Sequence, residues 1–237
     1  MSGHSHWAGI KHRKGINDAI RGKIFTKHGK MIAIAARDGG GKPDMNFSLK
    51  LAIEHAKADN MPKENIERSI KRGTGELKGA EITEIIYEAM GPGNILLLIK
   101  TATDNRNRTV SELKTILTRS GGKLGEMGSV MWNFEPAGSL TVEIGQANPD
   151  DIEMAAIEAG AKDIKNDNHS LIIHTQTKDL NKVQQTIIEL GCVITQVGLI
   201  YLPKTVVIID EHTRINYERL LEALDDQDDV QEIYDNL

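Results

Sequence analysis

Residues 139–202 decide the fold class of this 237-residue chain, and they read SLTVEIGQANPDDIEMAAIEAGAKDIKNDNHSLIIHTQTKDLNKVQQTIIELGCVITQVGLIYL. Short apolar runs alternate here with longer segments of helical periodicity. The pattern predicts strands at 140–144, 162–166, 171–175 and 193–201, and helices at 149–159 and 180–190. Their order along the chain is β-α-β-β-α-β, the order of a ferredoxin-like split unit. We therefore predict that this segment folds as one α/β domain.

The segments on either side of residues 139–202 repeat the same order. They predict strand 94–101, helix 109–120 and strand 130–134 before it, and strand 205–209, helix 214–224 and strand 230–234 after it. A further strand, 82–90, is joined to 94–101 by a tight Gly91-Pro92-Gly93 turn. We therefore predict that 139–202 is inserted into a discontinuous α/β domain made of 80–135 and 204–237, with Pro136 and Pro203 at the crossings. Element order alone leaves one larger mixed sheet open as the alternative.

The first 75 residues follow a different, helical pattern. Residues 1–15 have no apolar periodicity and are predicted to form a flexible basic arm. Residues 16–75 are predicted to form a basic helical domain with helices at 17–37, 46–57 and 62–72. The predicted fold class is therefore α+β, with a helical N-terminal three-helix domain followed by two ferredoxin-like α/β domains, one inserted into the other.

Charge is divided unevenly along the chain. The formal net charge of -5 argues against a nucleic-acid binder, because such domains are usually strongly basic. Residues 1–75, however, hold 15 Lys and Arg against 7 Asp and Glu, whereas residues 76–237 hold 14 against 27. This asymmetry predicts separate roles for the basic helical part and the acidic α/β part.

Several classes of function are excluded by what the sequence lacks. No apolar run approaches the roughly 20 residues of a membrane span, and the N-terminus has no signal-peptide core. The single cysteine, Cys192, rules out an intrachain disulfide, so we expect a cytoplasmic protein. No phosphate-binding loop, nucleophile elbow, HExxH or CxxC motif occurs. We therefore expect no enzymatic activity, cofactor, metal or small-molecule substrate, and we interpret the acidic residues 225–229 as a solvated turn.

Clustered cations in the first 75 residues predict contact with nucleic-acid phosphates. The candidates are Lys11, His12, Arg13 and Lys14 in the arm, Lys23, Lys27, Lys30 and Arg37 on the first helix, and Lys63, Arg68, Lys71 and Arg72 on the third. Only Asp18 and Asp38 lie near the first-helix stripe in sequence. Because an unpaired cationic stripe repels itself, an anion is expected to neutralise it. A solvated helix face is the alternative.

A second, smaller cationic spot lies in the acidic part of the chain. Arg106 and Arg108 fall in a predicted loop at the start of a helix, where backbone N–H groups favour anions. They are candidates for a secondary contact with an anion or a protein partner. Equally, the loop is interpreted as an Asx-type helix cap whose arginines form salt bridges with nearby acids.

Several long stretches carry a resemblance to a known family over the full length of the chain. HSHWAGIKHRKG, FTKHGKMIAIAARDGG, AIEHAKADNMPKENIERSIKRGTG, YEAMGPGNILLLIKTATDNRNRTVSELK and GSVMWNFEPAG occur in the order seen in the YebC/PmpR family. The resemblance implies a helical N-terminal domain plus two α/β domains, and a cytoplasmic DNA-binding transcriptional regulator without enzymatic activity. Members are also linked to translation at the ribosome and include mitochondrial translational activators.

Two functions therefore remain open at the level of sequence. The first is a DNA-binding transcriptional regulator with low direct base readout, since no helix presents the Asn, Gln and Arg pattern of a recognition helix. The alternative is a ribosome-associated translation factor that binds ribosomal RNA, for which no base code is needed. In both, the acidic domains are available for protein partners, and we expect no membrane contact.

Replacing Lys11, Arg13 and Lys14 together by Ala is expected to weaken nucleic-acid binding and to make its salt dependence shallower, with the fold retained. The physical reason is that each lost phosphate contact lowers the slope of log affinity against log salt by about 1. Binding titrations at several salt concentrations measure this slope. An unchanged slope would refute the role of the arm.

Overall fold

The computed structural model describes residues 18–145, 147–167 and 169–237, so the predicted arm at 1–15 lies outside the described residues. N-terminal helices are followed by two antiparallel four-stranded sheets, which confirms the predicted α+β class. The chain divides into two compact units. One is Phe134–Leu202, and the other joins the described residues up to Asn133 to Pro203–Leu237. Because the described strands form two separate sheets, the alternative of one larger mixed sheet is wrong.

The unit Phe134–Leu202 has the predicted order of elements. These are β4 (Phe134–Glu143), α6 (Pro149–Ala159), β5 (Ala161–Asp167), β6 (Ser170–Thr175), α7 (Leu180–Glu189) and β7 (Val193–Pro203). The sheet has the strand order β5-β6-β4-β7, and β6 is antiparallel to both β4 and β5. Alternate residues of the central strands, including Leu140, Val142, Leu171 and Ile173, are fully or almost fully buried. This alternation is what a sheet covered by helices on one face requires.

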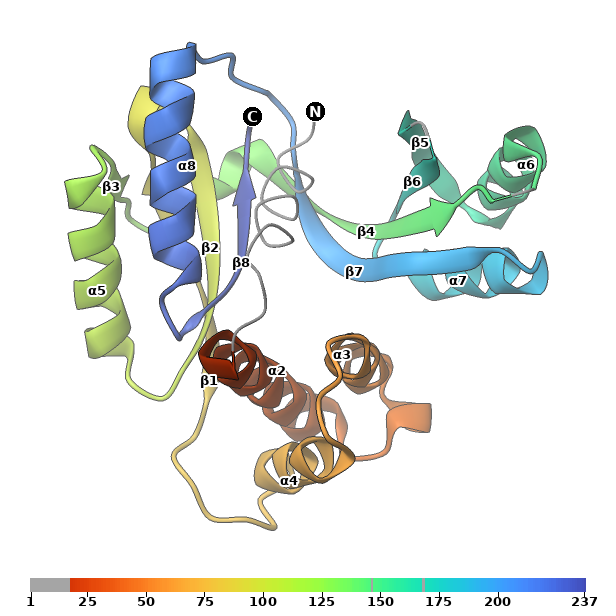
Figure 1. Cartoon of the computed structure of the whole chain (residues 1–237), viewed down its shortest axis with the longest axis horizontal. Coiled ribbons are helices and arrows are strands. Elements are labelled where there is room, and N and C mark those ends of the chain that lie inside the picture. The colour runs from red at the N-terminus through yellow and green to blue at the C-terminus, as the bar shows by residue number, and fades with distance from the viewer. Residues whose placement is uncertain (1–17, 146, 168) are drawn as a thin grey trace. The chain divides into compact units, whose positions relative to one another are not determined.

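The second sheet belongs to the other unit and has the strand order β3-β1-β2-β8. Its elements are β1 (Thr83–Met90), η2 (Pro92–Asn94), β2 (Leu96–Thr103), α5 (Arg106–Arg119), β3 (Lys123–Leu124), η3 (Met131–Asn133), α8 (Glu211–Asp225) and β8 (Val230–Asp235). Helices α5 and α8 lie side by side across one face of this sheet (Figure 1). Leu113 and Leu117 of α5 and Leu220 and Leu221 of α8 pack there with Leu97 of β2 in one buried cluster.

Two strands predicted for this second unit are wrong. Residues 131–133 form the short helix η3, and the segment 204–210 forms no strand. In both places side chains form hydrogen bonds with the backbone N–H and C=O groups that would otherwise pair with a neighbouring strand. The carboxylate of Glu88 accepts the N–H of Val130 and of Met131, while Asn133 pairs with the backbone of Thr205 in both directions. The sheet instead incorporates β1, so the flanking segments do not reproduce the predicted repeat.

The N-terminal helices are α2 (Asp18–Gly39), η1 (Pro43–Met45), α3 (Phe47–Ala58) and α4 (Lys63–Gly73). Ile32, Leu49 and Ala56 are fully or almost fully buried and form their own small core with Met61 and Ile66. Buried Asn46 joins the first two long helices: its side chain accepts the N–H of Leu49 as the N-cap of α3 and donates to the carbonyl oxygens of Ala35 and Gly40. This small core positions the cationic faces of α2 and α4.

Candidate nucleic-acid interface

Three lysines of α2 bind the turn between α8 and β8. Lys23, Lys27 and Lys30, here called the lysine row, follow one another at spacings of four and three residues and so lie along one side of the helix. They face residues 225–229, here called the acidic turn. The side chains of the lysine row lie 3.9 Å from Asp228 Oδ1, 3.2 Å from Asp225 Oδ1 and 2.7 Å from Asp229 Oδ1, respectively.

These contacts overturn the premise that the stripe on the first helix lacks acidic partners. Their acidic partners lie 198 to 205 positions away in sequence, which is why the local pattern did not reveal them. They also show that the interpretation of the acidic turn as merely solvated is wrong. The nucleic-acid role of the stripe itself stays a prediction.

Backbone carbonyl groups strengthen the attraction between the lysine row and the acidic turn. Lys27 Nζ donates to the carbonyl oxygen of Asp225 at 2.7 Å, and Lys23 Nζ donates to that of Asp226 at 3.1 Å. Asp225 is the last residue of α8 and Asp226 is its C-cap, where carbonyl groups have no partner within the helix. The lysines therefore neutralise the negative end of the α8 dipole as well as two carboxylates.

Asp229 is the most deeply buried carboxylate of the acidic turn, with 2 % of its side chain exposed. Its Oδ1 accepts from Lys30 Nζ at 2.7 Å, and its Oδ2 accepts from Arg108 Nη2 at 2.9 Å. The hydroxyl groups of Thr109 and Thr103 donate to the same Oδ2 at 2.8 and 3.2 Å. Burial by itself raises the pKa of Asp229, but the hydrogen bonds from Lys30, Arg108 and Thr109 outweigh it and hold the pKa well below its usual range.

Arg108 forms salt bridges with nearby acids, which was the alternative to an anion contact that the sequence left open. Besides Asp229 it binds Asp104 Oδ1 at 3.1 Å, and its backbone N–H donates to the side chain of Asn105, the N-cap of α5. The loop is thus an Asx-type cap with a salt-bridged arginine. Arg106 is exposed beside Tyr87, where burial raises the pKa of the tyrosine and the positive charge of Arg106 opposes this shift. An anion contact through Arg106 stays a prediction.

Arg37 is engaged at the other end of α2. Its Nη1 donates to the carbonyl oxygen of Ile82 at 2.6 Å and lies 3.3 Å from Glu81 Oε1, while its Nε donates to Asp38 Oδ1 at 2.8 Å. Hydrogen bonding to Asp38 raises the pKa of the guanidinium above its usual value. All four cations of the predicted α2 stripe therefore have partners within the chain.

The cations of α4 are more open to solvent. Lys63 has 88 % of its side chain exposed and lies 3.7 Å from Glu67, and Arg72 donates to the carbonyl oxygen of Ala80 at 3.1 Å. Arg68 and Lys71 are exposed, lie three residues apart on one side of the helix, and form no side-chain hydrogen bond or ion pair with another described residue. Among the described residues, they are the two predicted cations that are both exposed and without a partner.

Two further exposed lysines on α3 were missed in the sequence. Lys50 and Lys57 are seven residues apart and thus on one side of α3, and neither is paired with another described residue. Their spacing of seven residues was the available signal. With Arg68 and Lys71 they are the four exposed cations of α3 and α4 that have no partner among the described residues.

The sequence did not reveal that the loop at 127–132 is held by a buried carboxylate and exposes apolar side chains. The buried carboxylate of Glu88 accepts the backbone N–H groups of Gly128, Val130 and Met131 at 2.6, 2.5 and 2.8 Å. Burial raises the pKa of Glu88, but these three hydrogen bonds prevail and lower it. The loop so held leaves Met127 and Trp132 95 % and 62 % exposed.

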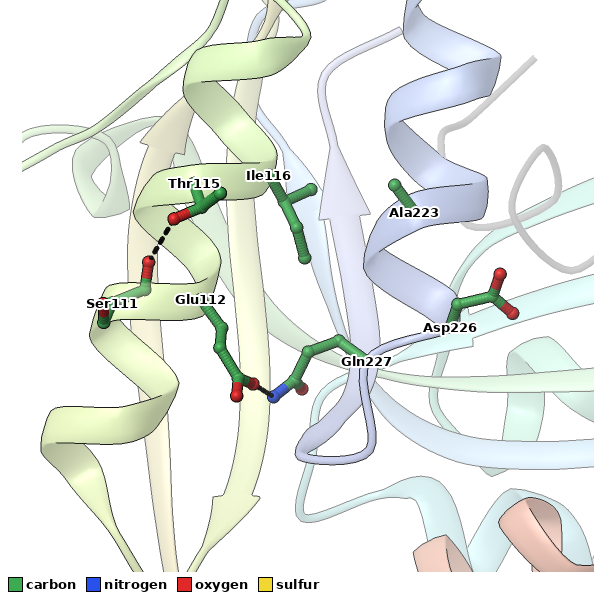
Figure 2. A pocket seen from close by; sticks show the side chains of 7 residues that line it. All are labelled: Ser111, Glu112, Thr115, Ile116, Ala223, Asp226 and Gln227. Atoms are coloured by element: carbon green, nitrogen blue, oxygen red, sulfur yellow. Dashed lines mark hydrogen bonds between the residues drawn. The ribbon is translucent and has the colours of Figure 1, made fainter.

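A shallow pocket of about 320 Å³ lies between α5 and α8 (Figure 2). It is lined by Ser111, Glu112, Thr115, Ile116, Ala223, Asp226 and Gln227. Gln227 Nε2 donates to Glu112 Oε2 at 2.8 Å at one end of the pocket, as Figure 2 shows, so these polar groups satisfy one another. Within the described ranges no group of three or more His, Cys, Asp or Glu side chains could hold a metal ion, and no helix is long and apolar enough to cross a membrane.

Comparison with known proteins identifies the class to which this fold and its basic helical region belong. Residues 5–76 match the family described as TACO1/YebC protein N-terminal domain, and residues 82–237 match TACO1/YebC second and third domain. The chain belongs to the TACO1/YebC family. The fold is similar to the crystal structure of a conserved hypothetical protein from Aquifex aeolicus, with a TM-score of 0.87 and 42 % identity over 98 % of this chain and 96 % of that one.

Curated relatives of the chain are named as regulators. A probable transcriptional regulatory protein from Moorella thermoacetica is 49 % identical over 100 % of this chain and 95 % of its own length. One of the same name from Halothermothrix orenii is 44 % identical over 100 % of this chain and 94 % of its own length. The names of these relatives support a regulatory rather than an enzymatic role.

Replacing Asp229 by Asn is expected to destabilise the chain by about 3–5 kcal/mol, because it leaves Lys30 and Arg108 without their buried counter-charge. The folded-state pKa of Asp229 is depressed below the unfolded value of about 3.9, so its contribution is present above that value and is lost as the pH falls toward the folded pKa. Asp229→Asn is therefore expected to flatten the loss of stability below about pH 5.

Chemical denaturation between neutral and acidic pH measures both effects. Asp44→Asn serves as the control, since Asp44 is exposed and has no side-chain partner among the described residues. If the two variants show the same stability and the same pH profile, the hydrogen bonds and ion pairs of Asp229 do not stabilise the fold.

Proposed function

We propose that the chain is a nucleic-acid-binding regulator of gene expression, in the first place a cytoplasmic DNA-binding transcriptional regulator with low direct base readout. The carrying observation is the set of accessible cations on the N-terminal helices. Arg68 and Lys71 of α4, together with Lys50 and Lys57 of α3, remain exposed and unpaired among the described residues. Phosphates are the ligands that such cations favour.

The chemistry of the exposed α4 face supports binding through phosphates rather than through bases. Its outward side chains are Lys, Arg and Glu, and its only amide, Asn65, is half-buried. Base-specific contacts in the major groove generally need Asn, Gln or Arg side chains placed at base-reading positions. No exposed Asn or Gln that could read adenine lies on α4, and its exposed arginines serve phosphates as well as guanine, so we assign the helix mainly to contacts with the phosphate backbone.

A ribosome-associated translation factor that binds ribosomal RNA is the alternative. Phosphate contacts serve DNA and RNA alike, and recognition of RNA by shape needs no base code. The excess of acid in residues 76–237 is suited to basic protein partners, which ribosomes supply.

Co-sedimentation of the full chain in salt-stable gradients tests the two candidates. Comigration with ribosomes removes the promoter proposal, whereas absence from ribosomes together with protection of one promoter removes the ribosomal one. In either case Arg68→Gln with Lys71→Gln is expected to reduce binding and to lower the salt slope by about 2.

The matched control replaces Lys178 and Lys182 by Gln, which removes the same charge from exposed positions in the unit Phe134–Leu202. If this control loses as much affinity as the α4 variant, the accessible cations of α4 are not the binding surface.

A further inference from the structure

The acidic turn presents to the lysine row the same chemistry that a nucleic-acid strand would present. Carboxylate and carbonyl oxygens surround the three ammonium groups at distances from 2.7 to 3.9 Å. Phosphate oxygens are anionic hydrogen-bond acceptors of the same kind. While the turn is in place, Lys27 and Lys30 retain only 14 % and 16 % side-chain exposure, so no phosphate reaches them.

The three contacts differ in how firmly they are held. Lys30 and Asp229 form the inner pair, and Asp229 is fixed further by Arg108 and two threonines. Lys23 and Asp228 form the outer pair, with 50 % and 68 % of their side chains exposed and 3.9 Å between the charged atoms. An exposed pair such as Lys23 and Asp228 contributes about 0–1 kcal/mol, so other anions displace it readily. Lys27 and Asp225 form an intermediate pair: their side chains are 14 % and 18 % exposed and lie 3.2 Å apart, but Asp225 has no second cationic partner among the described residues. Lys23 and Lys27 are called the outer lysines.

The acidic turn also contains more carboxylates than the inner anchor needs. Asp225, Asp226, Asp228 and Asp229 stand within five positions, and like charges so close repel one another and any approaching phosphate. The lysine row relieves this repulsion. Loss of the outer lysines to another polyanion would leave the acids of the turn facing water at the surface, while Asp229 keeps Lys30 and Arg108.

We propose that the acidic turn is an intramolecular competitor of nucleic acid for Lys23 and Lys27. The turn holds these two lysines in the free protein and yields them to phosphates in the complex, while Lys30 and Asp229 remain paired as the anchor. This inference rests on the proposed nucleic-acid function and deepens it: the cationic face of α4 makes the first contact, and opening of the turn adds the lysines of α2. The affinity of the chain for nucleic acid therefore depends partly on the carboxylates of its own acidic turn.

Asp225→Asn with Asp228→Asn tests the competition. In the full chain this variant is expected to bind a short fluorescein-labelled DNA duplex of mixed sequence at least about fivefold more tightly than wild type at low salt. Asp151→Asn with Glu158→Gln is the matched control, because it removes the same charge from exposed positions on α6. Adding Lys23→Gln and Lys27→Gln to the turn variant is expected to abolish the gain.

The outcomes separate this proposal from the function on which it rests. If the turn variant binds no more tightly than the matched control, while wild type binds the duplex, the competition is refuted and the DNA-binding function stands. If neither wild type nor any variant binds the duplex, the DNA-binding function fails and the competition fails with it.

Hydrogen exchange in the wild-type chain gives a second readout that needs no substitution. The N–H groups of Asp229 and Val230 donate to Gln227 Oε1 at 2.7 and 2.8 Å, and that of Asp226 donates to the carbonyl oxygen of Glu222 at 3.0 Å. Saturation with the duplex is expected to speed exchange at Asp226 and to leave Asp229 protected by the anchor. Slower or unchanged exchange at Asp226 contradicts release of the turn.

Discussion

The buried carboxylate of Asp229 is the interaction on which the larger unit depends. Lys30 from α2, Arg108 from α5 and Thr103 from β2 all donate to it, so one side chain joins the N-terminal helices, the helical layer and the sheet. A carboxylate removed from water is costly unless every lone pair is occupied, and here each oxygen accepts at least one charged donor. The carboxylate of Asp229 can therefore be buried only when its donors are in place. This requirement fixes the positions of α2, α5 and β2 around it as well as stabilising the fold.

This network changes the meaning of the uneven charge along the chain. The basic first 75 residues and the acidic remainder are not independent modules, because the lysine row of α2 is matched to the acidic turn. Among the residues of α3 and α4, the exposed cations without a described partner are Lys50, Lys57, Arg68 and Lys71, fewer than the sequence total suggests. The proposed nucleic-acid function rests on this remainder, and the relatives' names as regulators agree with it.

Local patterns sufficed to predict most elements and the fold class. The helix 46–57 was expected one residue from its observed bounds, and the order of elements in 139–202 was predicted fully, because apolar periodicity and caps act over a few residues. What failed depends on contacts distant in sequence. The carboxylate of Glu88 accepts the backbone N–H groups of residues 130 and 131, and the side chain of Asn133 donates to the carbonyl oxygen of Thr205. Residues 225–229 supply the acidic partners of the lysines on α2. The two partners of each contact lie more than 40 positions apart, so the short segments from which helices and strands are predicted never include both.

A double-mutant cycle between Lys30 and Asp229 tests the central claim most directly. The free energy of unfolding is measured for the wild-type chain, Lys30→Met, Asp229→Asn and the double variant. Since the two side chains share a buried contact at 2.7 Å, we predict a coupling free energy of about 1–3 kcal/mol, with the double variant less destabilised than the two single losses together. Additive losses would show that the helix and the acidic turn stabilise the chain independently and would contradict the account.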